Sequence, residues 1–202
     1  MPLPLGSREG VDPKLVAAID RLGQALRVQM GHVARMHGLT STQLQLLVRL
    51  RVDPPERRRV GALAAEFDVT QPTVSDAITT LERKGLVDRE PEPSDGRGVR
   101  IMLTRRGHDV AEAADAWQVR AQQLLVGVSE GDKERALGFL LGLLAELHRE
   151  GLVSVARMCP TCSFFREGQG RTPETHRCAI LDIDLGPGDL RVDCPEHEGL
   201  AA

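Results

Sequence analysis

The sequence predicts a mainly helical fold: a winged helix-turn-helix, with a wing of two or three β-strands, within a helical dimer. A small, irregular, Cys-rich extension is expected at the C-terminus. Three observations lead to this prediction. Apolar residues recur at helical spacing up to about residue 150. Two short helical segments joined by a tight turn precede two alternating strands. All four cysteines lie in the last quarter of the chain, where helical periodicity has ended.

The first two helices are marked by their ends and by their apolar spacing. Asp12 and Pro13 predict a helix start, with Asp at the N-cap and Pro at the first helical position. This helix should run up to Gly38, because apolar residues recur along one face: Leu15, Ile19, Leu22, Leu26 and Val33. Residues 40–50 predict a second helix, which the segment Asp-Pro-Pro at 53–55 ends.

The next two helices form the predicted helix-turn-helix. Residues 60–67 predict a short helix, followed by a turn at Asp68 and Val69. Thr70 can cap the second helix, which ends at Lys84 and Gly85, a glycine C-cap after basic residues. One face of this second helix is apolar and should pack inward: Val74, Ile78 and Leu81.

Two strands and two long helices complete the helical part. Residues 86–90 and 99–103 alternate as strands around a turn-rich tip, PEPSDGRG. A helix is expected from Thr104 to about Val126, and a last helix follows residues 129–132. The last helix carries a long apolar stripe: Leu137, Leu140, Leu141, Leu144 and Leu147. Such a stripe is too long for the outer helix of a monomer, so part of it should face a second copy.

Composition and charge limit the class of protein. The chain is 41% hydrophobic and 27% charged, without any stretch near the roughly 20 apolar residues of a membrane span. The N-terminus lacks the features of a secretory signal, so we expect a cytoplasmic protein. The net charge is −3, but residues 159–202 carry −4, and residues 49–59 contain five arginines. The helical part can therefore carry a basic surface.

The second helix of the helix-turn-helix is the one expected in the major groove of DNA. Short polar side chains suited to base edges and phosphates lie at its remaining positions: Gln71, Thr73, Ser75, Asp76 and Thr79. Arg97 at the wing tip is placed to enter a minor groove. Arg58 and Arg59 either contact phosphates or belong to a solvated loop. Asp76 is the least suited of these residues, because a carboxylate repels phosphate unless it accepts from cytosine.

The segment VGALAAEFDVTQPTVSDAITTLERKGLVDREPEPSDGRGVRIMLTRRG resembles the MarR family of regulators. The likeness covers roughly residues 12–150. It implies a dimer interface made by the first and the last two long helices, and a ligand crevice between this interface and the DNA-binding lobe. It also implies that Asp95 orients Arg97 in the wing. A MarR-type dimer would bind a pseudo-palindromic operator of double-stranded DNA.

The cysteines follow the spacing C-x2-C-x15-C-x15-C, at Cys159, Cys162, Cys178 and Cys194. In a reducing cytosol such a cluster is typical of a metal site. Zinc usually takes paired C-x2-C knuckles, and only the first pair fits. The segment resembles a high-potential iron-sulfur protein in Cys-x-x-Cys-x-Phe-Phe and in the residues beside the last two cysteines, although the Trp that usually precedes the last Cys is absent. We therefore prefer a [4Fe-4S] cluster to one zinc ion, with His176 and His197 as substitute ligands.

These patterns give three functional hypotheses. The first is a homodimeric, DNA-binding transcriptional regulator tuned by a metal or iron-sulfur centre; the second senses a small organic ligand and keeps a structural zinc. The third is a redox or electron-transfer protein. An enzyme is not expected, because the chain contains no P-loop, dinucleotide fingerprint or nucleophile-base spacing. The expected organisation is a tail at 1–11, a winged-helix and dimerisation domain at 12–150, and a metal-binding extension at 151–202.

Overall fold

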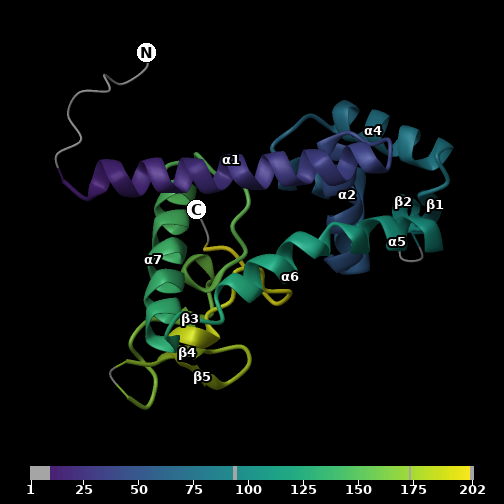
Figure 1. Cartoon of the computed structure of the whole chain (residues 1–202). Coiled ribbons are helices and arrows are strands. Elements are labelled where there is room, and N and C mark those ends of the chain that lie inside the picture. The colour runs from purple at the N-terminus through teal and green to yellow at the C-terminus, as the bar shows by residue number, and fades with distance from the viewer. Residues whose placement is uncertain (1–9, 93–94, 173, 201–202) are drawn as a thin grey trace.

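The computed structural model describes residues 10–92, 95–172 and 174–200 of the chain. Helix α1 (Asp12–Met36) runs along the molecule. A winged-helix lobe lies at one end of α1, and α7 (Glu130–Arg149) with the C-terminal tail lies at the other (Figure 1). None of the described helices is long and apolar enough to cross a membrane.

The winged-helix lobe is built in the predicted order. It contains α2 (Ser41–Val52), a 3-10 turn (Pro55–Arg57), α3 (Val60–Glu66) and α4 (Gln71–Arg83), then the strands β1 (Val87–Glu92) and β2 (Asp95–Leu103), and α5 (Arg105–Ala113). Its core is aliphatic, and the largest fully buried side chains in it come from α2, α3, α4, β1 and β2: Leu44, Leu46, Leu47, Leu50, Leu63, Ile78, Leu81, Val74, Val87 and Ile101. The mainly helical winged fold is thus confirmed.

Side-chain caps explain where several helices begin. The Thr70 hydroxyl accepts a hydrogen bond from the Thr73 N–H at the start of α4. The Thr104 hydroxyl caps α5 in the same way. Such caps satisfy backbone donors that have no partner within the helix. At its other end α4 is followed by Gly85 at φ +66°, the left-handed conformation expected of a glycine C-cap.

The wing is an antiparallel pair in which Val87 lies opposite Leu103 and Arg89 opposite Ile101. The register shifts between Pro91 and Glu92, near the tip. The Ile101 N–H donates to the Arg58 carbonyl at 2.7 Å, so the segment before α3 lies against the wing. The wing is therefore attached to the rest of the lobe through β2.

Two helix boundaries differ from the sequence-based prediction. The helix expected from Thr104 to Val126 is divided at Ala114 into α5 and α6 (Asp115–Leu124). The Ala114 N–H bonds to the carbonyl of Ala111, three residues back, so the helix tightens there by one 3-10 bond. At the start of α1 the N-cap is Val11, not Asp12, and Asp12 lies in the first turn without a side-chain cap.

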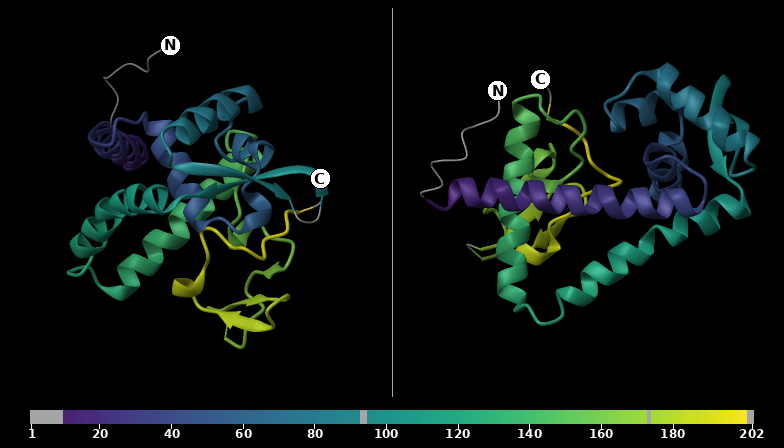
Figure 2. Two further views of the ribbon diagram at one scale, coloured as in Figure 1. Left: turned by 90° about the vertical axis from the view of Figure 1, so that its right-hand side faces the viewer. Right: turned by 45° about the horizontal axis from the view of Figure 1, so that its top comes forward.

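The tail folds against α7. It contains two 3-10 turns (Cys159–Thr161 and Pro187–Asp189) and a small antiparallel sheet in the order β3 (Phe165–Arg166), β4 (His176–Cys178), β5 (Ile183–Leu185). The sequence predicted an irregular extension, and three strands this short leave no alternation to detect. A second apolar cluster joins the tail to α7, with Leu141, Ala145 and Met158 buried in it. In Figure 2 the tail lies beside α7, and part of it reaches toward the winged-helix lobe.

Candidate nucleic-acid interface and cysteine centre

Helix α4 has one buried and one exposed face. The buried face carries Val74, Ile78 and Leu81. The polar residues that the sequence assigned to DNA share the other face: Gln71, Thr73, Ser75, Asp76 and Thr79. Ser75 is half-buried, and the other four are exposed. Helix α4 lies on the outer side of its lobe, where a groove of DNA can reach it (Figure 1).

The wing and α4 are tied together by Arg89 of β1. Its Nη2 donates to the Thr79 hydroxyl at 2.9 Å, and its Nε lies 3.3 Å from the Glu82 carboxylate. Thr79 also donates to the Ser75 carbonyl, as helical threonines do. For Asp95 and Arg97 the backbone lies in β2, while their side chains lie outside the described part of the structure.

The arginine run before α3 is engaged within the protein. Arg58 is half-buried; its Nε donates to the Asp53 carbonyl at 2.9 Å, and its Nη1 lies 3.8 Å from the Met102 sulfur. Arg59 is also half-buried, and it too has an interaction within the chain. Arg57 donates to the Pro195 carbonyl in the tail at 3.0 Å. Arg58 in particular serves the packing of the wing against the lobe.

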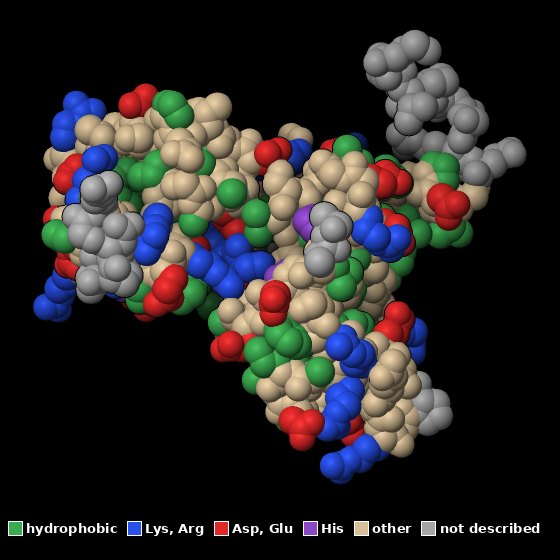
Figure 3. All heavy atoms as spheres, turned by 180° about the vertical axis from the view of Figure 1, so that it is seen from behind, with side chains coloured by type: hydrophobic (Ala, Val, Ile, Leu, Met, Phe, Trp, Pro, Cys, Tyr) green, Lys and Arg blue, Asp and Glu red, His purple; other side chains and the backbone are tan. Residues whose placement is uncertain are grey.

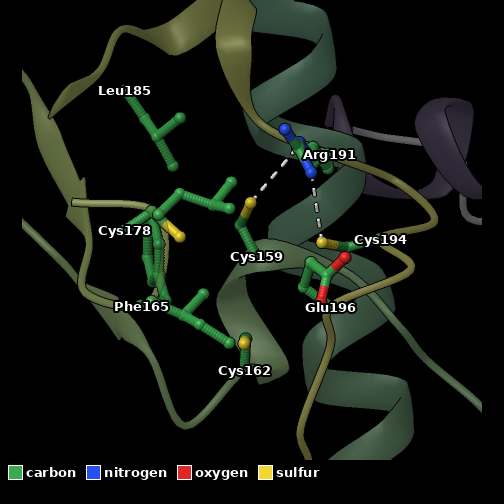
Figure 4. Close-up of a pocket in the computed structure, with 10 residues that line it drawn as sticks. Cys159, Cys162, Phe165, Cys178, Leu185, Arg191, Cys194 and Glu196 are labelled. Carbon is green, nitrogen blue, oxygen red and sulfur yellow. Dashed lines mark hydrogen bonds between the residues drawn. The ribbon is translucent and has the colours of Figure 1, made fainter. Parts of the chain in front are cut away.

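The four cysteines line one cavity of the tail. Cys159, Cys162, Cys178 and Cys194 face it together with Phe165, Ile180, Leu181, Leu185, Arg191 and Glu196. Figure 4 shows the four sulfur atoms distributed around this cavity, with Phe165 and Leu185 beside them. The small sheet and the last turn thus bring together cysteines that are separated by up to 15 residues in the sequence. All four are free thiols.

Arg191 provides two hydrogen bonds to these sulfurs. Its backbone N–H donates to Cys159 Sγ at 3.2 Å, and its Nη1 donates to Cys194 Sγ at 3.5 Å (Figure 4). Burial raises the pKa of the Cys159 thiol, the Arg191 N–H lowers it, and the charges of the other three cysteines raise it again. Among the described residues, no three His, Cys, Asp or Glu side chains are grouped closely enough to hold a single metal ion.

The two histidines that the sequence offered as substitute ligands are used elsewhere. His197 Nε2 lies 3.0 Å from the Thr161 hydroxyl and 3.1 Å from its carbonyl oxygen. His176 Nδ1 accepts from the Gly168 N–H at 3.1 Å, and its ring lies 5.0 Å from that of Phe165. Neither histidine is among the residues that line the cysteine cavity.

A polar junction joins the tail to the winged-helix lobe, and sequence reasoning missed it. We call it the Asp193 junction; it consists of Arg49 and Asp53 of α2 and its C-cap, Arg57, Glu66 of α3, Arg157 and Asp193. Seen from behind, basic side chains gather where the lobe meets the tail (Figure 3). Ion pairs between residues 36 to 144 positions apart leave no periodic pattern in a sequence, so no signal could have revealed them.

The charges in this junction stabilise one another. Partial burial is the largest influence on Asp193 and acts to raise its pKa, but the hydrogen bonds from Arg157 and Arg49 lower it, and the net pKa is below the ordinary value. Burial likewise acts to lower the pKa of Arg49, and the hydrogen bonds to Asp193 and Asp53 raise it above its usual range. Asp193 and Arg49 are therefore both charged at neutral pH.

A further cavity lies where the family resemblance places a ligand crevice. It measures about 260 Å³ and lies between α1, α2 and the α5–α6 helices. Its lining is mixed, with Leu26, Met30, Val48 and Ala114 beside the polar Gln45, Asp115 and Gln118. Asp115 is paired with Arg51 of α2. The cavity can accept a small molecule with an apolar body and a few polar groups.

The family comparison concerns the winged helix-turn-helix. Residues 37–98 match the model of the MarR family. The match begins after α1, contains α2, α3, α4 and β1, and extends into β2. Over these residues the chain is therefore similar to the MarR family.

Several solved structures share the fold of this chain. A MarR protein from Peptoclostridium difficile is 18% identical, with 74% of this chain and 95% of that chain covered at a TM-score of 0.58. The transcriptional regulator SlyA is 23% identical, with 67% and 95% covered and a TM-score of 0.56. MepR of S. aureus, solved in complex with DNA, is 24% identical, with 64% and 94% covered and a TM-score of 0.56. At these identities the likeness establishes the fold.

Proposed function

We propose that this protein is a transcriptional regulator that binds a pseudo-palindromic DNA operator as a homodimer. The observation that carries the proposal is the exposed polar face of α4 on a MarR-type winged helix-turn-helix. Its side chains at Gln71, Thr73 and Thr79 are short hydrogen-bonding groups without charge, which suits base edges. A protein with this fold, MepR, has been solved with DNA.

A homodimer is supported by apolar side chains that the single chain leaves uncovered. They lie on the helices at the end of the molecule away from the wing: Leu15, Val16, Leu22 and Leu26 of α1, Val119 and Leu124 of α6, and Phe139, Leu140 and Leu144 of α7. Leu141 is buried within the chain against the tail, so it is unavailable to a partner. Exposed apolar surface of this extent is typical of a subunit interface.

We further propose that the cysteine cavity holds a [4Fe-4S] cluster. Four thiols around one cavity give the ligand set of such a cluster. A single zinc ion needs four thiolates at about 2.3 Å from one point, and the described side chains are not grouped that closely. The cavity measures only about 20 Å³, so a cluster would require its lining, which includes the exposed Ile180 and Leu181, to move outward. Donors to sulfur, as from Arg191, tune the reduction potential of clusters.

The second candidate is a regulator that senses a small organic molecule, with a structural zinc in the tail. The mixed cavity between α1, α2 and the α5–α6 helices favours it. The two candidates differ in what changes operator affinity, and both keep the same DNA-binding surface. A purely redox or electron-transfer protein would not need the exposed polar face of α4.

Two measurements test the proposal. Full-length protein purified without oxygen should select, from a library of random duplexes, a pseudo-palindrome with half-sites about one helical turn apart. Failure to enrich any sequence would overturn the assignment as a regulator. The absorption spectrum of the same preparation tests the centre: a brown sample with a broad band in the blue supports the cluster. A colourless sample with one zinc per chain would overturn the cluster and favour the second candidate.

A further inference from the structure

The segment that carries the last cysteine also contacts the helix-turn-helix. The Cys194 N–H donates to the Arg157 carbonyl at 2.8 Å. This bond joins the segment around Cys194 to the loop that leads to Cys159. On its other side, Arg57 donates to the Pro195 carbonyl at 3.0 Å. Residues 191–195 therefore lie between the cysteine cavity and the winged-helix lobe.

Asp193, the neighbour of Cys194, makes the central contact. Its Oδ2 accepts from Arg49 Nη1 of α2 at 2.7 Å, and its Oδ1 accepts from Arg157 Nε at 2.9 Å. The two oxygens are thus held by different parts of the molecule, one by the lobe and one by the tail. A shift of the segment that carries Cys194 must lengthen at least one of these bonds or move Arg49 with it.

The same junction reaches α3 and the turn that leads to α4. Arg157 Nη1 lies 2.7 Å from the carboxylate of Glu66, the last residue of α3, and Arg49 Nε lies 3.6 Å from the other oxygen of that carboxylate. In the turn before α4, Asp68 accepts from the Ser154 hydroxyl at 2.9 Å. Asp68 has φ +50°, in the left-handed region that few residues other than glycine adopt.

The junction is balanced in charge and partly shielded from water. Three arginines (Arg49, Arg57 and Arg157) face three carboxylates (Asp53, Glu66 and Asp193). The side chains of Arg49, Arg157 and Glu66 are only 18%, 15% and 19% exposed. Charge pairs in such surroundings interact more strongly than fully exposed pairs. Without the Asp193 charge, the arginines would outnumber their partners.

The tail leaves the DNA-facing helix uncovered. In Figures 1 and 2 the small sheet of the tail lies away from α4, and the polar residues of α4 remain exposed. The tail therefore cannot act by blocking the recognition helix. An effect of the cysteine centre on DNA binding can instead pass through contacts of the tail with the lobe, which reach α2 and α3.

We propose that Asp193 is the positioning residue that couples the cysteine centre to the helix-turn-helix. This inference rests on the function proposed above. Loading or emptying the centre alters the segment around Cys194, and Asp193 transmits the change to Arg49 of α2 and, through Arg157, to Glu66 of α3. Asp193 itself is not among the residues that line the cysteine cavity.

The test compares operator affinity of full-length protein in the loaded and the emptied state, with the duplex selected by the wild type and one salt concentration throughout. In the wild type the two affinities should differ by at least about fivefold, the lower end of ordinary allosteric coupling. Asp193→Asn should keep the metal content and bring this ratio close to one. The matched control is Asp182→Asn, because Asp182 pairs with Arg177 within the tail, and asparagine tolerates its positive φ.

Each outcome separates the two hypotheses. If Asp193→Asn retains the wild-type ratio, the coupling through Asp193 is wrong while the proposed function stands. If the wild type binds no duplex, the proposed DNA-binding function itself is wrong. If it binds the duplex equally in both states, regulation by the cysteine centre and the coupling through Asp193 are wrong, while the DNA-binding function stands. Should Asp193→Asn lose its metal, Glu66→Gln replaces it, because Glu66 meets the same arginines from α3 without touching the cysteine segment. An unchanged ratio in Glu66→Gln would overturn the coupling.

Discussion

Replacing Gly107 by alanine tests how the wing is fixed to the helices behind it. Gly107 lies in the first turn of α5, against the segment that enters β1. A Cβ at this position would lie 1.9 Å from the Leu86 carbonyl oxygen and 3.2 Å from Leu103 Cδ2, whereas ordinary contact begins at 3.4 Å. The helix and the strand would therefore have to separate by about 1.5 Å, the difference between the 1.9 Å to the Leu86 oxygen and the 3.4 Å at which ordinary contact begins.

The cost of this separation follows from what holds Leu86 in place. The obstacle is a backbone atom, so no change of rotamer relieves it. The Leu86 carbonyl also accepts from the Thr104 N–H at 3.2 Å, a hydrogen bond that the separation would break. Loss of one such bond costs about 1 kcal/mol, and forced overpacking adds about 1–3 kcal/mol. We expect Gly107→Ala to lower the free energy of unfolding by about 3 kcal/mol.

Urea unfolding followed by far-UV circular dichroism measures this effect. The control is Gly138→Ala in α7, where a new Cβ meets nothing within 4 Å. There the higher helix propensity of alanine should raise the free energy of unfolding by about 0.5–1 kcal/mol. The two substitutions are chemically identical, so opposite signs isolate the steric contact. A loss below about 1 kcal/mol for Gly107→Ala would refute the reasoning.

Three further predictions concern DNA, the dimer and the cysteines. Arg97→Ala should weaken binding of the selected duplex by about 1–3 kcal/mol, measured by gel shift, and an unchanged affinity would exclude a wing contact. Asp substituted together at Leu22 and Leu140, both exposed in the single chain, should give monomers in sedimentation, and a persistent dimer would count against this interface. Cys162→Ser should sharply lower the metal content with nearly native circular dichroism, because ligands of one centre act as a unit; full metal content would remove Cys162 from the site.

Elements with strong local signals were predicted well. Thr70 caps α4 as expected, and the helix expected to start at Thr104 does begin there, because a capping hydroxyl acts within three residues of its own position. Gly85 ends α4 for a similarly local reason. The buried face of α4 was read from period 3.6 alone. In each case the physical cause lies within one or two turns of the residue, so the sequence contains it.

What the sequence could not reveal depends on contacts between distant segments. From the sequence, the arginines at 57–59 could either contact phosphates or belong to a solvated loop. In the structure Arg57 and Arg58 donate hydrogen bonds to groups of the protein itself. The convergence of the four cysteines was an inference from their number, and their common cavity needed the fold of the small sheet. The roles of Gln71, Thr73 and Arg97 toward DNA stay predictions.

The small size of the tail links its folding to its cysteine centre. Few of its described side chains are buried, and they are either cysteines or lie against α7 and the cavity: Met158, Cys159, Thr161, Leu185 and Cys194. A segment of about 50 residues rarely supplies a sufficient apolar core, so it needs a metal, a cross-link or a larger body to pack on. Here the body is α7 and the Asp193 junction, and the proposed cluster supplies the metal. Cys194 and Asp193 are adjacent, so binding of the proposed cluster and docking of the tail onto α2 would order the same segment of chain. The free energies of these two events would therefore be linked. If the proposed cluster occupies the cavity, its removal should therefore also weaken the hold of the tail on the helix-turn-helix.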